Sequence, residues 1–186
     1  MSMETPPPPS ELSFVLASEM PKPPVIQDAP VNDLAALFKL SQRMWSLCRQ
    51  EDGVGLSAVQ VGIPWRMFIT EVPERGLEVF LNCHYEPTGD MQGWSMEGCL
   101  SLPRDADGQR PTYVVRRHYA VRLVGHRLVW DANLAVEAVD EVVEGFRAVV
   151  LQHEIGHQDG VLISDIGRPL SSVRVSGGAS VSATRA

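Results

Sequence analysis

The chain has 186 residues, of which 44% are hydrophobic and 21% are charged, and its formal net charge is −7. This composition is typical of one globular domain that folds in water, and the acidic balance argues against a nucleic-acid partner. No apolar run approaches the about 20 residues that span a membrane, and no secretion signal is recognisable, so we expect a cytoplasmic protein without a membrane partner.

The two ends of the chain differ in composition from its middle. Prolines crowd residues 1–24, where they block the hydrogen bonds of helices and strands, so we expect a flexible N-terminal tail. Residues 171–186 are mostly small and polar and show no hydrophobic period, which predicts a second flexible tail. A single domain is therefore expected over residues 25–170.

Residues 32–50 show apolar side chains near helical spacing, with Asn32 or Asp33 available as a cap. A helix is predicted there, with Cys48 as a core residue. The other cysteines are Cys83 and Cys99, and an odd number of cysteines in a chain of intracellular character argues against a disulfide framework.

The stretch GVGLSAVQVG, residues 53–62, resembles a phosphate-binding loop at first reading. A nucleotide fingerprint needs an apolar strand before it and a helix after it. Here CRQED precedes the glycines, and VGIPW follows them with a helix-breaking proline. The nucleotide interpretation is therefore disfavoured, and the glycines need another ligand.

Antiparallel strands are predicted for most of the middle of the chain. RMFITEV (66–72) and LEVFLN (77–82) form an expected hairpin around a turn at 73–76. Residues 112–131 alternate apolar and polar side chains with a break at Gly125, and 134–140 continue the alternation.

A helix is predicted from Glu141 to Asp159, with Asp140 as its cap and Gly160 after its end. Six side chains share one face at helical spacing: Val142, Phe146, Val149, Val150, His153 and His157. This is the clearest helical pattern in the sequence.

The motif HEIGH places His153 and His157 one helical turn apart, so both imidazoles can bind one metal ion, with Glu154 beside it to transfer protons. Two histidines on one face can also be packing residues, but a buried pair without partners would be costly to desolvate. A catalytic site needs a third protein ligand and an open position for water. No histidine follows, and Cys99 in MEGCLSLP is the obvious soft donor upstream.

Three stretches resemble one family in the same order and at similar separations. GVGLSAVQVG is similar to GxGLAAxQ, MEGCLSLP to EGCLS, and QHEIGH to QHExDH, the motifs of peptide deformylases. The resemblance covers about residues 25–169. It implies an α+β fold with antiparallel strands packed around a central metal-binding helix.

The resemblance also implies the chemistry of the site. Its residues would be the metal ligands Cys99, His153 and His157, the general acid/base Glu154, and the oxyanion donors Gln60 and Leu100 N–H. The activity implied is hydrolysis of the formyl group from N-terminal formylmethionine of new polypeptides, with release of formate. The metal would be one divalent ion, Fe²⁺ first, with Zn²⁺, Ni²⁺ or Co²⁺ as alternatives.

The substrate would be an N-formylmethionyl peptide, including nascent chains on the ribosome, and the enzyme is expected to be a monomer. Matching positions imply contacts with the substrate from Val54, Gly55, Glu97, Gly98, Phe146, Val149 and Val150. For the apolar members, core packing explains each position equally well. Arg117 is either near the peptide cleft or an exposed strand residue.

Some residues depart from the family pattern. Gly156 replaces an acid beside the second histidine, Ser57 replaces an alanine, and Cys83 with His84 replaces a common proline. These changes leave two alternatives open: a paralogue that acts on another N-acyl group or a peptide amide, and a non-catalytic peptide-binding relative. A zinc endopeptidase is disfavoured because no downstream ligand follows the motif.

Overall fold

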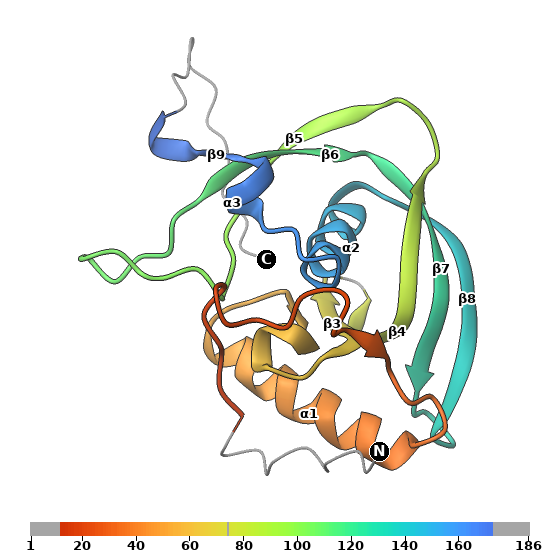
Figure 1. Ribbon diagram of the computed structural model, residues 1–186. Helices are drawn as coiled ribbons and strands as arrows, with labels where there is room; N and C mark the ends of the chain where they lie inside the picture. Colours follow the sequence, from red (N-terminus) through yellow and green to blue (C-terminus); the bar gives the residue numbers. More distant parts are fainter. Residues whose placement is uncertain (1–11, 74, 173–186) are drawn as a thin grey trace.

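The computed structural model describes residues 12–73 and 75–172 (Figure 1). The fold is a mixed α and β one with a curled sheet, as the sequence predicts in its coarse outline. None of the helices in these two stretches is both long enough and apolar enough to cross a membrane. All three cysteines are free and buried, in agreement with the absence of a predicted disulfide framework.

The part of the chain that the structure describes contains nine strands in two sheets. The strands are β1 (Gln27–Asp28), β2 (Gly55–Ser57), β3 (Trp65–Val72), β4 (Gly76–Pro87), β5 (Gln92–Glu97), β6 (Tyr113–His118), β7 (Ala120–Val129), β8 (Ala135–Glu144) and β9 (Arg168–Pro169). The larger sheet has the order β1-β3-β4-β7-β8, with β2 beside β3, and the smaller has the order β5-β6-β9. Among the strands of the described residues only the β1–β3 pair is parallel, so the predicted antiparallel sheet and β3–β4 hairpin are confirmed.

The helices are α1 (Leu34–Gln50), α2 (Gly145–Gln158) and α3 (Ile163–Ile166), and the 3₁₀ turns are η2 (Ala58–Val61) and η3 (Leu170–Ser172). The predicted first helix is confirmed, and Asp33 caps it by accepting a hydrogen bond from the N–H of Ala36 at 3.1 Å. Cys48 is buried at its end, in the core position that was predicted.

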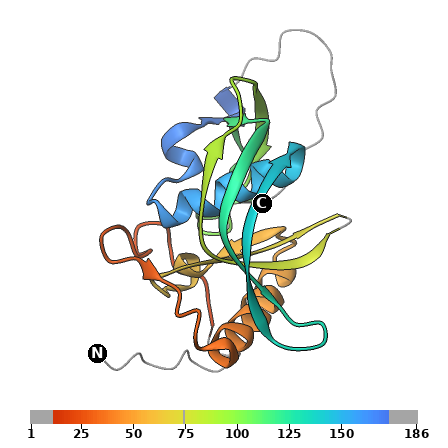
Figure 2. The ribbon, with the colours of Figure 1, turned by 90° about the vertical axis from the view of Figure 1, so that its right-hand side faces the viewer.

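Both faces of the larger sheet carry buried side chains. Successive side chains of a strand point to opposite sides, so neighbours in the sequence pack in different clusters. Met67 and Leu81 pack in one hydrophobic cluster with α1. Phe68 and Phe80, their strand neighbours, pack in a second cluster with Leu151 of α2. The two helices therefore lie on opposite sides of this sheet (Figure 2).

The second helix begins later than the sequence pattern indicates. Residues 141–144 continue β8, where Val143 pairs with Val121 of β7 and Glu144 with Ala120. The helix starts at Gly145, so Asp140 does not cap it, and Val142 is a strand residue whose side chain is 59% exposed. The alternating pattern of 134–140 extends to Glu144. Val142 and Val143 belong to this strand pattern, but their spacing also fits a helix.

Helix α2 contacts strands of both sheets, and its C-terminal half is buried almost all round. Gln152 fixes its orientation by bonding both backbone groups of His118, at 3.0 Å to the N–H and 2.9 Å to the carbonyl oxygen. The helix therefore reaches from the larger sheet to the strand β6 of the smaller one (Figure 1).

The predicted N-terminal tail is too long. Residues 12–24 lie against the domain, with Leu12 and Met20 buried, and the N–H groups of Val15 and Ala17 donate to the carbonyl oxygens of Gln60 and Ser101. The apolar residues between the prolines supply this packing, which the proline count obscured. Residues 1–11 and 173–186 lie outside the described residues, and the domain boundaries stay a prediction.

Cys83, which departs from the family pattern, lies at an irregularity in β4. The pairing of β4 with β7 shifts between Leu81 and His84, and Asn82 has a φ of 54° there. Its side chain bonds the backbone N–H of Ala29 at 2.6 Å. Such a bulge bends the strand. Cys83 is buried within it and packs in the same hydrophobic cluster as Phe68 and Phe80.

Candidate metal centre and active site

Cys99, which follows β5, comes together with His153 and His157, which both lie on α2. Their potential ligand atoms all lie within 4.8 Å of one another, and all three residues are buried. The Cys99 Sγ is 3.4 Å from Nε2 of His157, and the centroids of the two imidazole rings are 4.9 Å apart. One thiol and two imidazoles form a donor set suited to a divalent transition metal with one position open to water.

The protonation states of these groups also suit metal binding. Burial lowers the pKa of His157 well below its ordinary value, and the neighbouring His153 lowers it further, so the neutral imidazole is favoured. Burial raises the pKa of Cys99 to about 12, although the N–H groups of Ser101 and Leu102 hydrogen-bond to the sulfur and lower it. Without an ion the thiol stays protonated, so uptake of a cation would release its proton.

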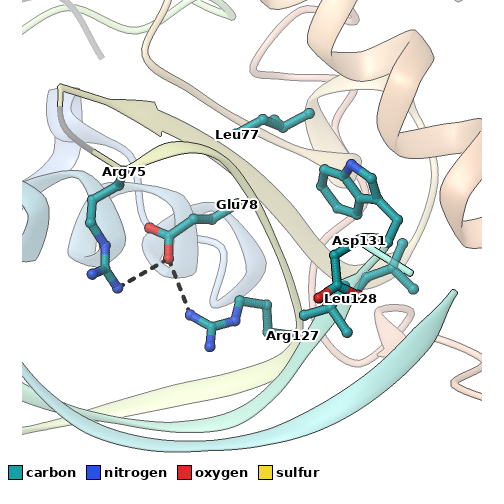
Figure 3. Close-up of a pocket in the computed structure, with 8 residues that line it drawn as sticks. Arg75, Leu77, Glu78, Arg127, Leu128 and Asp131 are labelled. Carbon is teal, nitrogen blue, oxygen red and sulfur yellow. Dashed lines mark hydrogen bonds and ion pairs between the residues drawn. The ribbon is translucent and has the colours of Figure 1, made fainter. Parts of the chain in front are cut away.

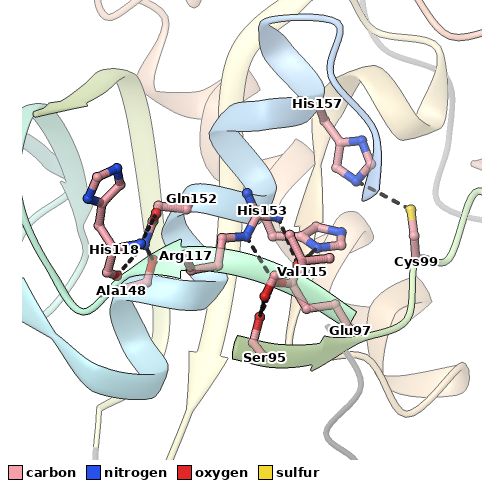
Figure 4. A network of polar contacts seen from close by, with 10 residues as sticks. All are labelled: Ser95, Glu97, Cys99, Val115, Arg117, His118, Ala148, Gln152, His153 and His157. Carbon is pink, nitrogen blue, oxygen red and sulfur yellow. Dashed lines mark hydrogen bonds and ion pairs between the residues drawn. The ribbon is translucent and has the colours of Figure 1, made fainter. Parts of the chain in front are cut away.

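Glu97 orients the first histidine (Figure 4). Its Oε2 lies 2.8 Å from Nδ1 of His153, which leaves Nε2 of that ring for the ion. Arg117 holds the same carboxylate through two hydrogen bonds of 2.9 and 2.8 Å. Burial raises the pKa of Glu97, but the bonds from Arg117 and His153 outweigh it and hold the pKa at about 2.

Arg117 is therefore a buried partner of Glu97, with 8% of its surface exposed, and the alternative of an exposed strand residue is wrong. Glu97 was expected among the substrate contacts, and its contacts here are with Ser95, Arg117 and His153. No strand was predicted over 92–97, so the sequence offered no signal for the contact between Glu97 and Arg117, which depends on the pairing of β5 with β6.

Glu154 lies against the glycine stretch. A Cβ placed on Gly55 would come within 2.5 Å of its Oε1, so only glycine leaves room for the carboxylate in this position. Neither oxygen of Glu154 has a hydrogen-bond partner among residues 12–73 and 75–172. Burial raises the pKa of Glu154 well above its ordinary value, and the charge of Glu97 raises it further. A carboxyl group of this kind is suited to take up and release a proton.

Gln60 points its amide nitrogen toward the centre. Its Oε1 accepts from the N–H of Ser57 at 2.8 Å, which fixes the orientation of the amide. Its Nε2 lies 3.2 Å from Ser101 Oγ and 3.7 Å from Cys99 Sγ. Ser101 is a neighbour that the sequence did not single out. Its place in the MEGCLSLP motif, two residues after Cys99, could have indicated that it lies near the site.

Leu100 lies between Cys99 and Ser101, and its N–H finds no acceptor among the described residues. The group is thus free to donate to a ligand near the metal ligands. Leu100 and Gln60 are therefore both within the Cys99 neighbourhood, in agreement with the proximity that the resemblance implies.

The apolar side chains that were expected to contact the substrate differ in how far they are buried. Val150 is buried, Val54 and Val149 are partly exposed, and Phe146 keeps 37% of its surface exposed. Gly98 is buried next to Cys99. Their role in holding a methionine side chain stays a prediction.

Gly156 lies against the backbone that follows α2. A Cβ placed there would meet the carbonyl oxygen of Val161 at 3.4 Å. The Nδ1 of the adjacent His157 is buried and has no hydrogen-bond partner in the described part of the chain. Gln158 connects the C-terminal end of α2 to the glycine stretch, because its Nε2 lies 3.5 Å from Ser57 Oγ.

A cavity of about 540 Å³ lies elsewhere, between the β3–β4 turn and the end of β7 (Figure 3). Its wall includes Glu78, to which Arg75 and Arg127 form ion pairs of 3.5 and 3.3 Å. None of the metal ligands or their polar partners lines it. Volume therefore does not identify the candidate site, whereas the buried donors do.

Comparison with known proteins agrees with this geometry. The polypeptide deformylase family matches residues 24–172. The peptide deformylase of Leptospira biflexa is 34% identical over 137 residues, which cover 68% of this chain and 70% of that protein. The peptide deformylase of Rhodopirellula baltica is 36% identical over 136 residues, which cover 70% of this chain and 61% of that protein.

A solved structure shares the fold as well. The class I type b peptide deformylase of Acinetobacter baumannii with Met-Ala-Ser bound has a TM-score of 0.67 and 25% identity, and the match covers 83% of this chain and 97% of that one. The match to the family extends over almost all of the described residues and includes every motif that carries the site. The chain belongs to the polypeptide deformylase family.

Proposed function

We propose that this protein removes the formyl group from the N-terminal formylmethionine of newly made polypeptides and releases formate. The observation that carries this proposal is the buried Cys99, His153 and His157 cluster with Glu154 beside it. A protein that only bound peptides would have no need of a carboxylate held without a partner in the described part of the chain.

The three donors fit a divalent ion, which Cys99 Sγ and one nitrogen of each histidine would hold. When bound, such an ion polarises water and the carbonyl oxygen of an amide. Glu154 takes a proton from the attacking water and delivers it to the departing amine of methionine. The raised pKa of Glu154 suits this transfer, because its carboxylate is a stronger base than an exposed one.

Two neutral donors stabilise the charge that develops on the formyl oxygen. Gln60 Nε2 and the N–H of Leu100 both lie beside Cys99; the Gln60 Oε1 accepts from Ser57 and the Leu100 carbonyl oxygen accepts from Arg110. Loss of one such donor typically costs about 3 kcal/mol of transition-state stabilisation. Glu97 and Arg117 keep His153 in one orientation throughout the reaction.

The finer assignments belong to the same proposal. The ion is Fe²⁺, with Zn²⁺, Ni²⁺ or Co²⁺ as substitutes, and the methionine side chain lies against Val54, Val149 and Val150. The protein acts as a cytoplasmic monomer on nascent chains at the ribosome. The net charge of −7 supports peptide recognition through the chain's own backbone and apolar groups rather than through RNA contacts.

The decisive assay measures formate released from formyl-Met-Ala-Ser by protein loaded anaerobically with Fe²⁺. Met-Ala-Ser, the peptide bound in the Acinetobacter baumannii structure, is what remains of this substrate after deformylation. Acetyl-Met-Ala-Ser serves as the comparison, since faster release of acetate than of formate would indicate a paralogue with another substrate. Full metal occupancy without formate release would contradict the proposal, and the Glu154→Gln variant must release formate at least about 100-fold more slowly.

A further inference from the structure

The segment Cys99–Leu102 carries a metal ligand and an oxyanion donor but belongs to no helix or strand. Its geometry depends on contacts with other parts of the chain. The carbonyl oxygen of Cys99 accepts from the N–H of Leu102 at 3.2 Å, and that of Ser101 accepts from the N–H of Ala17 at 3.2 Å. Both of these contacts are backbone to backbone.

The carbonyl oxygen between them is held by a side chain. Nε of Arg110 donates to the Leu100 oxygen at 3.0 Å, ten positions earlier in the chain. Nη1 of the same guanidinium donates to Glu51 at 2.8 Å, and its Cζ lies 6.0 Å from the centroid of the Phe14 ring. The side chain is 16% exposed. Arg110 is thus held from two sides where it meets Leu100.

A guanidinium is suited to this position because its rigid fork can donate to two acceptors at once. Arg104 makes a useful contrast. It also pairs with Glu51, but its other recorded bond goes to the carbonyl oxygen of Gly108, within its own loop. Only Arg110 of the two contacts the backbone of the segment with the metal ligand.

We propose that Arg110 is a positioning residue that fixes the Cys99–Leu102 segment so that the Leu100 N–H points at the developing oxyanion. With the Leu100 carbonyl oxygen bound on the outer side, the segment cannot rotate about its backbone torsions without breaking a charge-assisted hydrogen bond. The catalytic consequence rests on the proposed deformylase function. The structural consequence, a rigid segment, does not.

The test compares Arg110→Met and Arg110→Lys with the matched control Arg104→Met. We expect both Arg110 variants to lower kcat for formyl-Met-Ala-Ser at least about tenfold with KM changed less than about threefold, since a displaced donor acts in the transition state. Lysine keeps the charge but cannot bridge Leu100 and Glu51, so it should not rescue kcat. Arg104→Met should retain kcat within about twofold.

A second readout needs neither metal nor activity. Amide hydrogen exchange of residues 99–102 should be faster in Arg110→Met and in Arg110→Lys than in the unmodified protein, and unchanged in Arg104→Met. If the unmodified protein releases no formate, the deformylase proposal fails while the exchange rates still decide the role of Arg110. Unchanged exchange in both Arg110 variants, or an equal loss in Arg104→Met, would overturn the inference.

Discussion

Glu97 and Glu154 lie in the same site and are equally buried, each with 1% of its surface exposed, yet their surroundings are opposite. Arg117 and His153 hold the first carboxylate and keep its pKa at about 2. The second has no partner in the described chain, and its pKa is raised well above the ordinary value. Burial alone therefore does not set the role of a carboxylate. One orients a ligand as a permanent anion, and the other is free to exchange a proton.

The strongest test of this contrast is Glu154→Gln. The amide keeps the shape of the side chain but cannot accept a proton, so kcat should fall by about 10²- to 10⁴-fold. Metal content, measured by elemental analysis, should stay as in the unmodified protein because Glu154 is not a ligand. A variant that retained more than a tenth of the activity would exclude Glu154 as the proton carrier.

Gly55→Ala tests whether the position of Glu154 matters as much as its chemistry. The new methyl group would lie 2.5 Å from Oε1 of Glu154, so the carboxylate must move. A displacement of about 1 Å can cost about 100-fold in kcat. Gly93→Ala is the control, since a Cβ there meets nothing within 4 Å. Equal kcat values for the two variants would show that the close approach at Gly55 has no catalytic consequence.

Glu97→Gln tests the other carboxylate. Loss of the anion beside His153 should weaken metal affinity about 10- to 100-fold, measured by competition with a chelator. Glu78→Gln is the matched control, because Glu78 is also a buried carboxylate bound by arginines but lies away from the metal ligands. It should affect stability without changing metal affinity. The reverse pattern would assign Glu97 a purely structural role.

The pH dependence of stability gives a smaller effect with a definite sign. The pKa of Glu97 is lowered from 4.5 to about 2 on folding, so its charged contacts stabilise the fold above about pH 4.5 and lose this effect as the pH falls toward 2. The free energy of unfolding should therefore fall less steeply between pH 4.5 and 2 in Glu97→Gln than in the unmodified protein. Urea titrations over this range measure the two slopes, which should not coincide.

Gly156→Asp should have the smallest effect. An acid beside His157 is expected to raise metal occupancy only modestly, because the Cβ at 156 points toward the carbonyl oxygen of Val161. Gly156→Ala separates this charge effect from helix propensity, which alone favours Ala by about 1 kcal/mol. Elemental analysis of both variants checks the expectation, and identical occupancy would count against a role for the missing acid.

The sequence was sufficient to single out Cys99, His153 and His157 as a possible metal site, because the two histidines are one helical turn apart and Cys99 belongs to a motif with its own spacing. The first helix and the β3–β4 hairpin were likewise predictable from local periodicity. The start of α2 was not, since Val139, Val142 and Val143 have the i, i+3, i+4 spacing of a helical stripe, and tertiary pairing with β7 decides for the strand.

Contacts between distant segments could not be predicted in this way. The bidentate bond from Arg117 to Glu97 depends on the register of β5 and β6, which no local pattern fixes. The packing of residues 12–24 is of the same kind, because its hydrogen bonds end on Gln60 and Ser101 far along the chain. Local reading therefore identified the ligands but not the residues that hold them in place.

The junction of β8 and α2 has a consequence for how the site assembles during folding. The helix follows the strand directly at Gly145, which has a φ of 62° and donates its N–H to the carbonyl oxygen of Tyr119. With no intervening loop to absorb an error, a slip of two residues between β7 and β8 would carry both histidines about two strand residues, some 7 Å, away from Cys99. The correct register of the β7–β8 hairpin is thus required to bring the three side chains together. A protein with the wrong register would therefore fail to bind metal.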